Sequence, residues 1–406
     1  MSLPPVFHRL AWSNLAGQSA EQVALAAAPI LAVLVLGSAE GATGLLQTAQ
    51  TLPFLLAAIP AGLLADRLPR AQLMAAAEAL RLLALLGILA LIATGGITLF
   101  WLALLGLIGA CGTVAFSVAA PALVPALVPR DALPRANSRI ELARTSALAA
   151  GPAVAGALLG WLGAAPAFVL AAVLSGVAVL LLAGIAEQPR PRAPARHPLR
   201  EVREGIRFVA DHPLLRPIFV TQFVFNTALF VIHAVFVPYA IRRLGLDAAG
   251  VGLVLGTFGA GMVAGAAAAP RIMARLRLGL VVGIGPVSGF AAALLIALTA
   301  LLPSAWLAGA GFFLMGAGPV VWVVSTTTLR QQVTPDALLG RVSAINGLAW
   351  GARPVGAAIG AGLGALLGAE ACLILAAVFF LAQMLVILRS PVVALGAPGA
   401  CLAAAD

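Results

Sequence analysis

Lysine is absent from this chain of 406 residues, and charged residues of every kind make up only 9% of it. All 24 basic residues are therefore arginines. Without lysine, a chain cannot hold phosphate through a P-loop lysine or form the Schiff base of a pyridoxal-phosphate enzyme. A P-loop ATPase is thus excluded within this chain.

Histidine and cysteine are also scarce, so metal and disulfide chemistry have little support. The four histidines are far apart: His8, His197, His212 and His233. No HExxH or CxxC motif occurs. Two of the three cysteines, Cys111 and Cys372, lie in apolar runs and Cys401 lies in the tail. We expect no metal, no cofactor and no disulfide framework.

Hydrophobic residues make up 62% of the chain, and its mean hydropathy is +1.08. Soluble domains carry about 25% charged residues, so this chain has too little charge to cover a water-exposed surface. A helix that crosses hydrocarbon needs about 20 apolar residues, and the length allows about a dozen such helices. The composition therefore indicates a multi-pass, all-α membrane protein.

Apolar runs separated by glycine, proline and arginine predict twelve spans. Their expected ranges are 9–36, 41–65, 71–94, 97–124, 138–162, 164–186, 214–241, 247–270, 277–301, 304–329, 342–367 and 369–389. The first 14 residues lack the charged segment and short apolar core of a signal peptide, and we expect none. An even number of spans places both termini on one side.

The arginines indicate which side this is. Arg242 and Arg243 lie on one set of loops, and Arg81, Arg144 and Arg353 lie inside spans. The remaining 19 of the 24 lie on or beside the other set of loops, which predicts cytoplasmic termini in an inner or plasma membrane. These arginines lack aromatic interleaving, so the net charge of +10 does not indicate a nucleic-acid partner.

The sequence also contains an internal repeat. The residues Asp131-Ala132-Leu133 recur as Asp336-Ala337-Leu338, a shift of 205 residues. The repeat predicts two six-helix, pseudo-symmetric halves, an arrangement of transporters with a site at the membrane midplane. We expect an N-terminal half at 1–187, a cytoplasmic linker at 188–213 and a C-terminal half with a short tail at 214–406. The linker includes an amphipathic helix that we expect to tie the halves together, although lipid or partner binding is an alternative.

The loop after the second span resembles the signature loop of the major facilitator superfamily. Residues Gly62 to Arg70 read GLLADRLPR and match the pattern G-x-L-a-D-r-x-x-r/k, except that Ala71 replaces the second terminal basic residue. The resemblance implies the twelve-helix major facilitator fold. It also implies a cytoplasmic latch in which Asp66 accepts hydrogen bonds from Arg67, Arg70 or a helix start. The alternative is an ordinary solvated loop.

Two further features resemble particular branches of that superfamily. Residues 204–208 (EGIRF), 211–215 (DHPLL) and 136–138 (ANS) are similar to the branch of macrolide-efflux proteins and enterobactin exporters. In the fifth span, Gly151-Pro152 resembles the Gly-Pro motif of antiporter members, where proline bends the helix and glycine allows close packing. The resemblance implies export, and simple helix packing is the alternative.

Inserting an ionisable side chain into a membrane costs about 2.5 to 3.5 kcal/mol of free energy, so each one within a span is expected to have a partner or a function. In the first span, Asn14, Gln18 and Glu21 form one polar stripe. The repeat shift predicts a matching stripe on the seventh span: Gln222, Asn226 and His233. We expect Glu21 to carry an exchanged proton, because a carboxyl group removed from water holds its proton more tightly. Neutralisation of Glu21 by a neighbour is the alternative.

Three more residues complete the expected substrate cavity: Gln47, Gln50 and Arg353. Arg353 cannot lose its charge, so it must face water, a carboxylate or an anionic substrate. The other charged residues of the spans are expected to form structural pairs: Glu78 with Arg81, and Glu141 with Arg144.

Together these features predict a secondary active transporter and not an enzyme. We expect proton-coupled efflux of a small drug-like or siderophore-like compound by alternating access. A facilitator or importer of sugars or organic acids is the alternative, followed by a lipid transporter or a membrane sensor. The expected partners are membrane lipid, a small-molecule substrate and protons, and the expected oligomeric state is a monomer.

Overall fold

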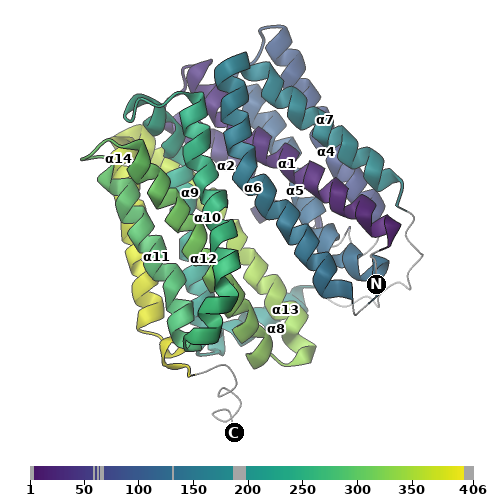
Figure 1. Cartoon of the computed structure of the whole chain (residues 1–406), viewed down its shortest axis with the longest axis vertical. Coiled ribbons are helices and arrows are strands. Elements are labelled where there is room, and N and C mark those ends of the chain that lie inside the picture. Colours follow the sequence, from purple (N-terminus) through teal and green to yellow (C-terminus); the bar gives the residue numbers. More distant parts are fainter. Residues whose placement is uncertain are drawn as a thin grey trace.

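The apolar runs of the sequence form long helices, because hydrocarbon requires each backbone N–H and C=O group to be paired within its own segment. The computed structural model describes residues 4–57, 60–61, 64, 68–129, 132–185 and 198–396, and no strand occurs in these ranges. The α-helices in Figure 1 are α1 Pro5–Leu34, α2 Glu40–Leu56, α4 Arg70–Ala93, α5 Leu99–Leu127, α6 Leu133–Leu162, α7 Ala164–Ala183, α8 Pro198–Asp211, α9 Leu215–Arg242, α10 Ala248–Arg275, α11 Leu278–Leu298, α12 Ala305–Val333, α13 Asp336–Leu348 and α14 Ala352–Leu388.

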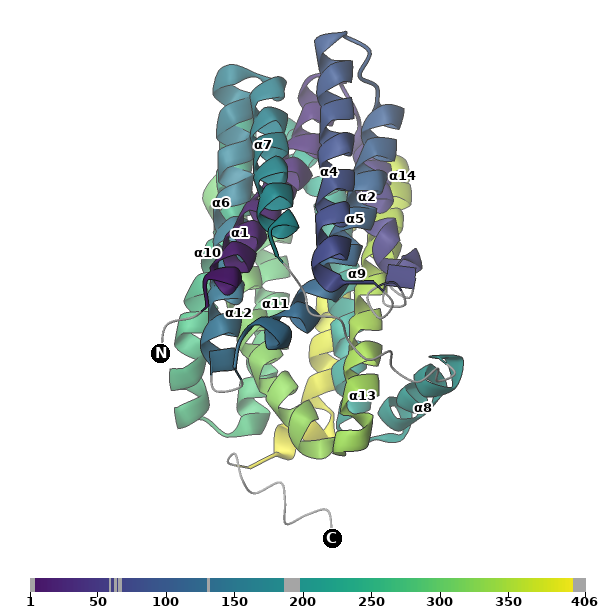
Figure 2. The same ribbon diagram turned by 90° about the vertical axis from the view of Figure 1, so that its right-hand side faces the viewer.

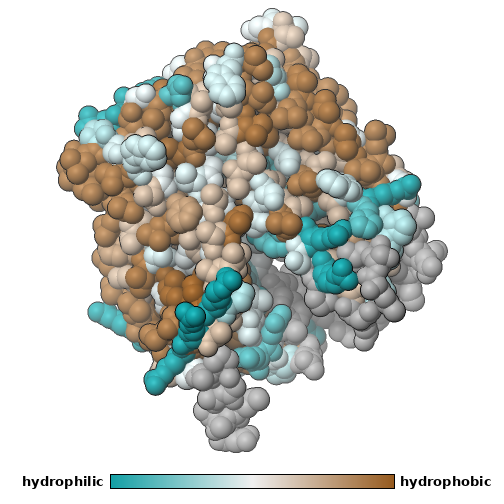
Figure 3. Space-filling model, viewed as in Figure 1, coloured by the Kyte–Doolittle hydropathy of each residue, from teal (hydrophilic) through white to brown (hydrophobic). Residues whose placement is uncertain are grey.

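Within the described residues, ten helical segments are long and apolar enough to cross a membrane. Their outer faces carry large apolar side chains such as Leu180 and Trp306, which are 76% and 89% exposed. Figure 3 shows the same apolar character over much of one face. An exposed surface of this kind requires lipid, so the chain is a multi-pass membrane protein.

One expected boundary differs from the structure, and another agrees with it. The second span was expected to reach residue 65, but α2 ends at Leu56, one turn after the internal Pro53, and the chain is helical again at the described residues 60, 61 and 64. The boundary expected between the spans 342–367 and 369–389 coincides with a break at Gly368 inside α14, which follows α13 and a short 3-10 turn. Proline inside a helix removes a backbone hydrogen bond, which weakens the helix near α2's end.

The backbone of α14 leaves helical geometry at Gly368, where φ is 82° and ψ is 176°. Gly163, between α6 and α7, has nearly the same geometry, with φ 86° and ψ −173°. These two glycines are 205 residues apart, which is the shift of the sequence repeat. Only glycine adopts this backbone conformation easily, so the repeat preserves the residue type that each turn requires.

The helices form two groups, which we name the N-terminal helix group (α1 to α7) and the C-terminal helix group (α9 to α14). Figure 1 shows them side by side, and Figure 2 shows α8 beside α13 at the lower end of the molecule. Two seams join the groups, α6 against α10 and α2 against α14. Small residues form these seams: a side chain on Gly252 would collide with the carbonyl oxygen of Pro152, and one on Gly44 with Ala361. In lipid the hydrophobic effect does not drive helices together, so the close packing of these small residues holds the two groups in contact.

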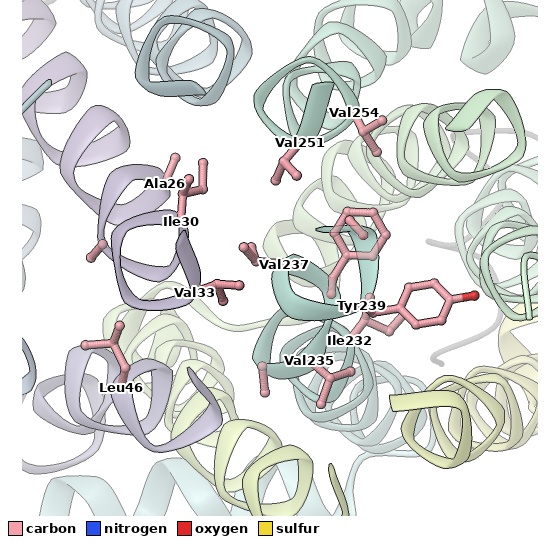
Figure 4. Close-up of a cluster of buried hydrophobic side chains, with 14 of the residues drawn as sticks. Ala26, Ile30, Val33, Leu46, Ile232, Val235, Val237, Tyr239, Val251 and Val254 are labelled. Atoms are coloured by element: carbon pink, nitrogen blue, oxygen red, sulfur yellow. The ribbon is translucent and has the colours of Figure 1, made fainter. Parts of the chain in front are cut away.

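The hydrophobic clusters distinguish the two ends of the bundle. At the end that contains Gly163, one cluster crosses both groups and includes Ile30 and Val33 of α1 and Val235 and Val251 of α9 and α10 (Figure 4). At the opposite end, where α8 lies, each cluster belongs to one group, as around Met74 in the N-terminal helix group. Figure 3 shows the molecule hollowed between the groups at this α8 end. The bundle is therefore closed at the Gly163 end and open at the α8 end.

Candidate functional site

Arg81 of α4 is the centre of a buried polar network in the N-terminal helix group. Its Nη1 donates to Glu78 Oε1 at 2.6 Å and to the carbonyl oxygen of Gly17 at 3.0 Å. Its Nη2 donates to Thr113 Oγ1 at 2.7 Å and lies 3.5 Å from Glu21 Oε2. We call these residues, together with Ser175, the Arg81 network. The expected Glu78–Arg81 pair therefore exists, and it also contacts Glu21.

The two carboxylates of this network are held differently. The side chain of Glu78 is 1% exposed, and its second oxygen accepts a hydrogen bond from Ser175 Oγ at 2.8 Å. The side chain of Glu21 is 14% exposed and contacts the network only through the longer bond to Arg81. Glu78 is thus enclosed and fully bonded, whereas Glu21 lies at the accessible edge of the network.

Arg353 of α14 lies in the other helix group. Its Nε donates to Asn226 Oδ1 at 3.3 Å. Its guanidinium carbon lies 4.9 Å from the ring centroid of Trp350, 5.0 Å from that of Phe54 and 5.4 Å from that of Phe230. Cations are attracted to the faces of such rings, most strongly to tryptophan. Phe54 belongs to α2, so this cluster spans both helix groups.

No carboxylate of the described chain lies within 4.0 Å of the Arg353 nitrogens. Arg353 and Glu21 are nevertheless close enough to interact electrostatically. Arg353 was expected to face water, a carboxylate or an anionic substrate, and the described protein supplies no carboxylate in direct contact. It supplies an amide oxygen and aromatic rings instead.

His233 of α9 lies among three phenyl rings. The ring centroids of Phe230, Phe312 and Phe258 are 5.4, 6.1 and 6.4 Å from the imidazole. Its Nε2 atom is buried and has no hydrogen-bond partner in the described residues. His233 therefore continues the aromatic environment that begins at Arg353, with Phe230 between them.

The remaining expected cavity residues are divided between packing and partly exposed positions. Asn14 is 3% exposed, and its side chain donates to the carbonyl oxygen of Ile140 at 3.3 Å, which ties α1 to α6. Gln50 is 5% exposed and lies beside Gly106 of α5. The others are half-buried: Gln18, Gln47 and Gln222.

The residues expected to form the latch lie mostly outside the described residues. This applies to Gly62, Asp66 and Arg67, while Arg70 is the first residue of α4. Arg70 has interactions, and the geometry of the latch as a whole remains a prediction from the sequence.

The Gly151-Pro152 motif lies where α6 crosses two other helices. A side chain on Gly151 would collide with Gln22 of α1. The carbonyl oxygen of Pro152 faces Gly252 of α10, in the seam between the helix groups. The motif therefore allows α6 to contact α1 and α10 closely, which any relative movement of the groups must alter.

A polar contact that the sequence did not reveal joins the two helix groups at the Gly163 end. Arg242 Nη1 lies 3.4 Å from Glu40 Oε2, and Arg242 Nη2 donates to the carbonyl oxygen of Ser38 at 2.8 Å. Nearby, Thr43 Oγ1 donates to the carbonyl oxygen of Ala234 at 3.0 Å. These hydrogen bonds and this ion pair join the two groups at the Gly163 end. They supplement the shared hydrophobic cluster.

We expect Arg242→Gln to favour opening at the Gly163 end, because it removes the ion pair and weakens the bond to Ser38. The cost in stability should be below about 1 kcal/mol, as for other partly exposed pairs. Cys372 is fully buried near this seam and serves as a natural reporter. With the other two cysteines replaced by alanine, maleimide labelling of Cys372 should become faster. Arg243→Gln is the matched control, because Arg243 pairs with Glu370 of its own group at 3.8 Å. Equal labelling of both variants would contradict a role for Arg242 in closure.

Sequence reasoning missed several residues of the site. Trp350 precedes Arg353 by three residues, a spacing that places two residues on one helical face, and this signal could have identified it. No local pattern connects Thr113, Ser175 or Phe54 to the site, because their contacts are made between helices far apart in the sequence.

Comparison with known proteins places this architecture in a family. Residues 5–400 match the family of transmembrane secretion effectors. Over 252 residues the chain is 31% identical to the enterobactin exporter EntS of Citrobacter koseri, and also to that of Escherichia coli O1:K1. This match covers 61% of the chain and only 58% of each exporter.

Solved structures show the same fold. A bacterial homologue of the iron transporter ferroportin, in its inward-facing state, has a TM-score of 0.69 at 18% identity and covers 95% of this chain and 100% of its own. A POT family transporter in complex with 5-aminolevulinic acid has a TM-score of 0.75 at 13% identity, covering 96% and 97% of the two chains. These two transporters therefore have the same overall fold as this chain.

Proposed function

Because this chain belongs to the transmembrane secretion effector family of major facilitator transporters, we propose that it exports a small compound from the bacterial cytoplasm by proton-coupled alternating access. The observation that carries the proposal is the different bonding of the two carboxylates in the Arg81 network. Glu21 is the acid that exchanges the proton, and Glu78 is the permanent counter-charge of Arg81. The similarity to enterobactin exporters supports efflux of a siderophore-like or drug-like compound.

The Arg81 network supports proton exchange at Glu21 at low cost. When Glu21 gains a proton, Arg81 keeps its bonds to Glu78, Gly17 and Thr113. No cation is left buried without a partner, which would otherwise cost several kcal/mol. Both protonation states of Glu21 are therefore compatible with the same packed helices.

We propose twelve crossings in two six-helix halves, at 1–187 and 214–406, joined by the linker at 188–213. Support comes from the matching glycines Gly163 and Gly368, which imply that α14 contains two crossings, at 352–367 and 369–388. The 17 residues of α2 are close to the length that a thin or locally adapted bilayer needs. On this assignment the α8 end is cytoplasmic, as the arginine distribution predicts.

The open α8 end then makes this an inward-open conformation. Residues of the proposed cavity are Glu21, Gln18, Gln47, Gln222, Asn226, His233 and Arg353, with Asn14 and Gln50 as supports behind it. Closing the α8 end and opening the Gly163 end would require the two seams to pivot, with Gly151, Pro152 and the Asp66 loop as the moving elements.

Direction and coupling can be tested in membrane vesicles that contain the protein. In inside-out vesicles with an acidic lumen, at least one compound of a labelled panel of siderophores and drugs, with enterobactin and erythromycin among them, should accumulate, and vesicles without the protein serve as the control. Dissipating the pH gradient should abolish accumulation. Uptake confined to right-side-out vesicles would instead support the importer, and uptake that ignores the pH gradient would support a facilitator.

A further inference from the structure

The positive charge of Arg353 has no direct counter-charge in the described protein. The other arginines near the cavity and the seams have carboxylate partners: Arg81 with Glu78, Arg144 with Glu141, and Arg242 with Glu40. Of the donors of Arg353, only Nε reaches a described acceptor, Asn226. The paired Nη donors remain available. Their planar arrangement matches the two oxygens of a carboxylate or a similar anion.

The rings around Arg353 indicate what carries that anion. Trp350 is 41% exposed and Phe54 is half-buried, so both have surface that remains open to a ligand. A flat aromatic ring stacks on such side chains and on a guanidinium plane more favourably than a saturated ring of equal size. An anion attached to an aromatic ring therefore satisfies the charge and the shape of this site together.

Glu21 supplies the opposite charge on the opposite helix group. Its Oε2 has the 3.5 Å contact with Arg81, and its Oε1 has no hydrogen bond to a described residue. Glu21 and Arg353 border a common region, because α1 contacts α9 and Asn226 of α9 accepts the hydrogen bond from Arg353. A ligand that contacts both charges would connect the two helix groups.

We propose that the transported compound is an aromatic zwitterion: an anionic group on a flat ring, bound by Arg353, Trp350 and Phe54, and an ammonium group bound by Glu21. This inference rests on the proposed proton exchange. An exchanger requires its substrate to compete with the proton, and an ammonium group competes because it binds only the ionised Glu21. An anion alone would bind better when Glu21 is protonated, since the local charge is then more positive, and it could not be exchanged for the proton.

Four probes of similar size separate the parts of this proposal. They are 4-(aminomethyl)benzoate, its saturated analogue trans-4-(aminomethyl)cyclohexanecarboxylate, 4-methylbenzoate and 4-methylbenzylamine. Binding to the purified full chain is measured by isothermal titration. The aromatic zwitterion should bind tightest, about tenfold above the saturated analogue, and its binding should release a proton at a pH where Glu21 is protonated.

Three variants assign each group. Arg353→Lys should weaken the zwitterion and 4-methylbenzoate about tenfold and spare 4-methylbenzylamine, because a bidentate contact is lost. Glu21→Gln should show the reverse selectivity. Trp350→Leu should remove the preference for the aromatic ring. This variant is expected to fold, because Trp350 is partly exposed. Matched controls are Arg271→Lys and Trp306→Leu, both exposed and distant from the site.

Three outcomes would overturn the proposal. In the first, each variant loses affinity equally for all probes. In the second, the saturated analogue binds as well as the aromatic one, and in the third, no probe binds. The vesicle experiment with other compounds separates this outcome from failure of the proposed function. Proton-driven efflux without zwitterion binding overturns only the substrate class. Zwitterion binding with the expected selectivity, but without any proton-driven movement, overturns the exchange mechanism.

Discussion

Replacing Glu21 with glutamine is expected to abolish proton-driven efflux and to leave the protein folded. Glutamine keeps the size of the side chain but cannot exchange a proton. Arg81 retains its bonds to Glu78, Gly17 and Thr113, so the packing of α1, α4 and α5 is preserved. In reconstituted vesicles, efflux driven by an imposed pH gradient should fall to the level of empty vesicles, while counterflow of labelled substrate without a gradient should persist.

Glu141→Gln is the matched control for this experiment. Glu141 is also a glutamate of a span and also bonds to an arginine three residues away, but its side chain is 58% exposed. Its replacement should change proton-driven efflux by less than about twofold, because an exposed pair of this kind contributes little. Proton-driven efflux that survives Glu21→Gln unchanged would remove Glu21 from the coupling mechanism.

Replacing Arg81 with methionine is expected to destabilise the protein severely. The change leaves Glu78, which is 1% exposed, with a buried negative charge and with Ser175 as its one remaining described partner. Breaking a buried ion pair by removing one partner typically costs about 3 to 5 kcal/mol. Thermal unfolding in detergent micelles should show a large fall in the midpoint, and expression should decline with it.

Two further variants test this explanation. Arg144→Met removes an arginine that is 40% exposed, and it should cost no more than about 1 kcal/mol. The double variant Glu78→Leu with Arg81→Met removes both charges and should recover much of the lost stability, because no unpaired charge remains. If Arg81→Met proves no more harmful than Arg144→Met, the Arg81 network is not a stabilising element.

The sequence by itself determined the class of the protein and the location of most helices. A span must be long, apolar and internally hydrogen-bonded, and these requirements are local, so runs such as those that form α7 and α11 are recognisable without any tertiary information. The internal repeat was also visible in the sequence, although the equivalence of the turns at Gly163 and Gly368 became clear only from their backbone angles. The sequence of the first helix alone also indicated that Glu21 has a partner or a function, because a carboxyl group inside a membrane is costly.

Only the tertiary structure decided which charges meet. Arg81 was expected to pair with Glu78 alone, because a spacing of three residues is visible in the sequence, but its contacts with Glu21 and Thr113 depend on how α1 and α5 pack against α4. The aromatic surroundings of Arg353 likewise combine residues of α2, α9 and α14. Such contacts join positions far apart in the chain, and helix periodicity carries no information about which faces of different helices approach one another. Membrane insertion selects the helices one by one, whereas close packing between small residues selects their partners.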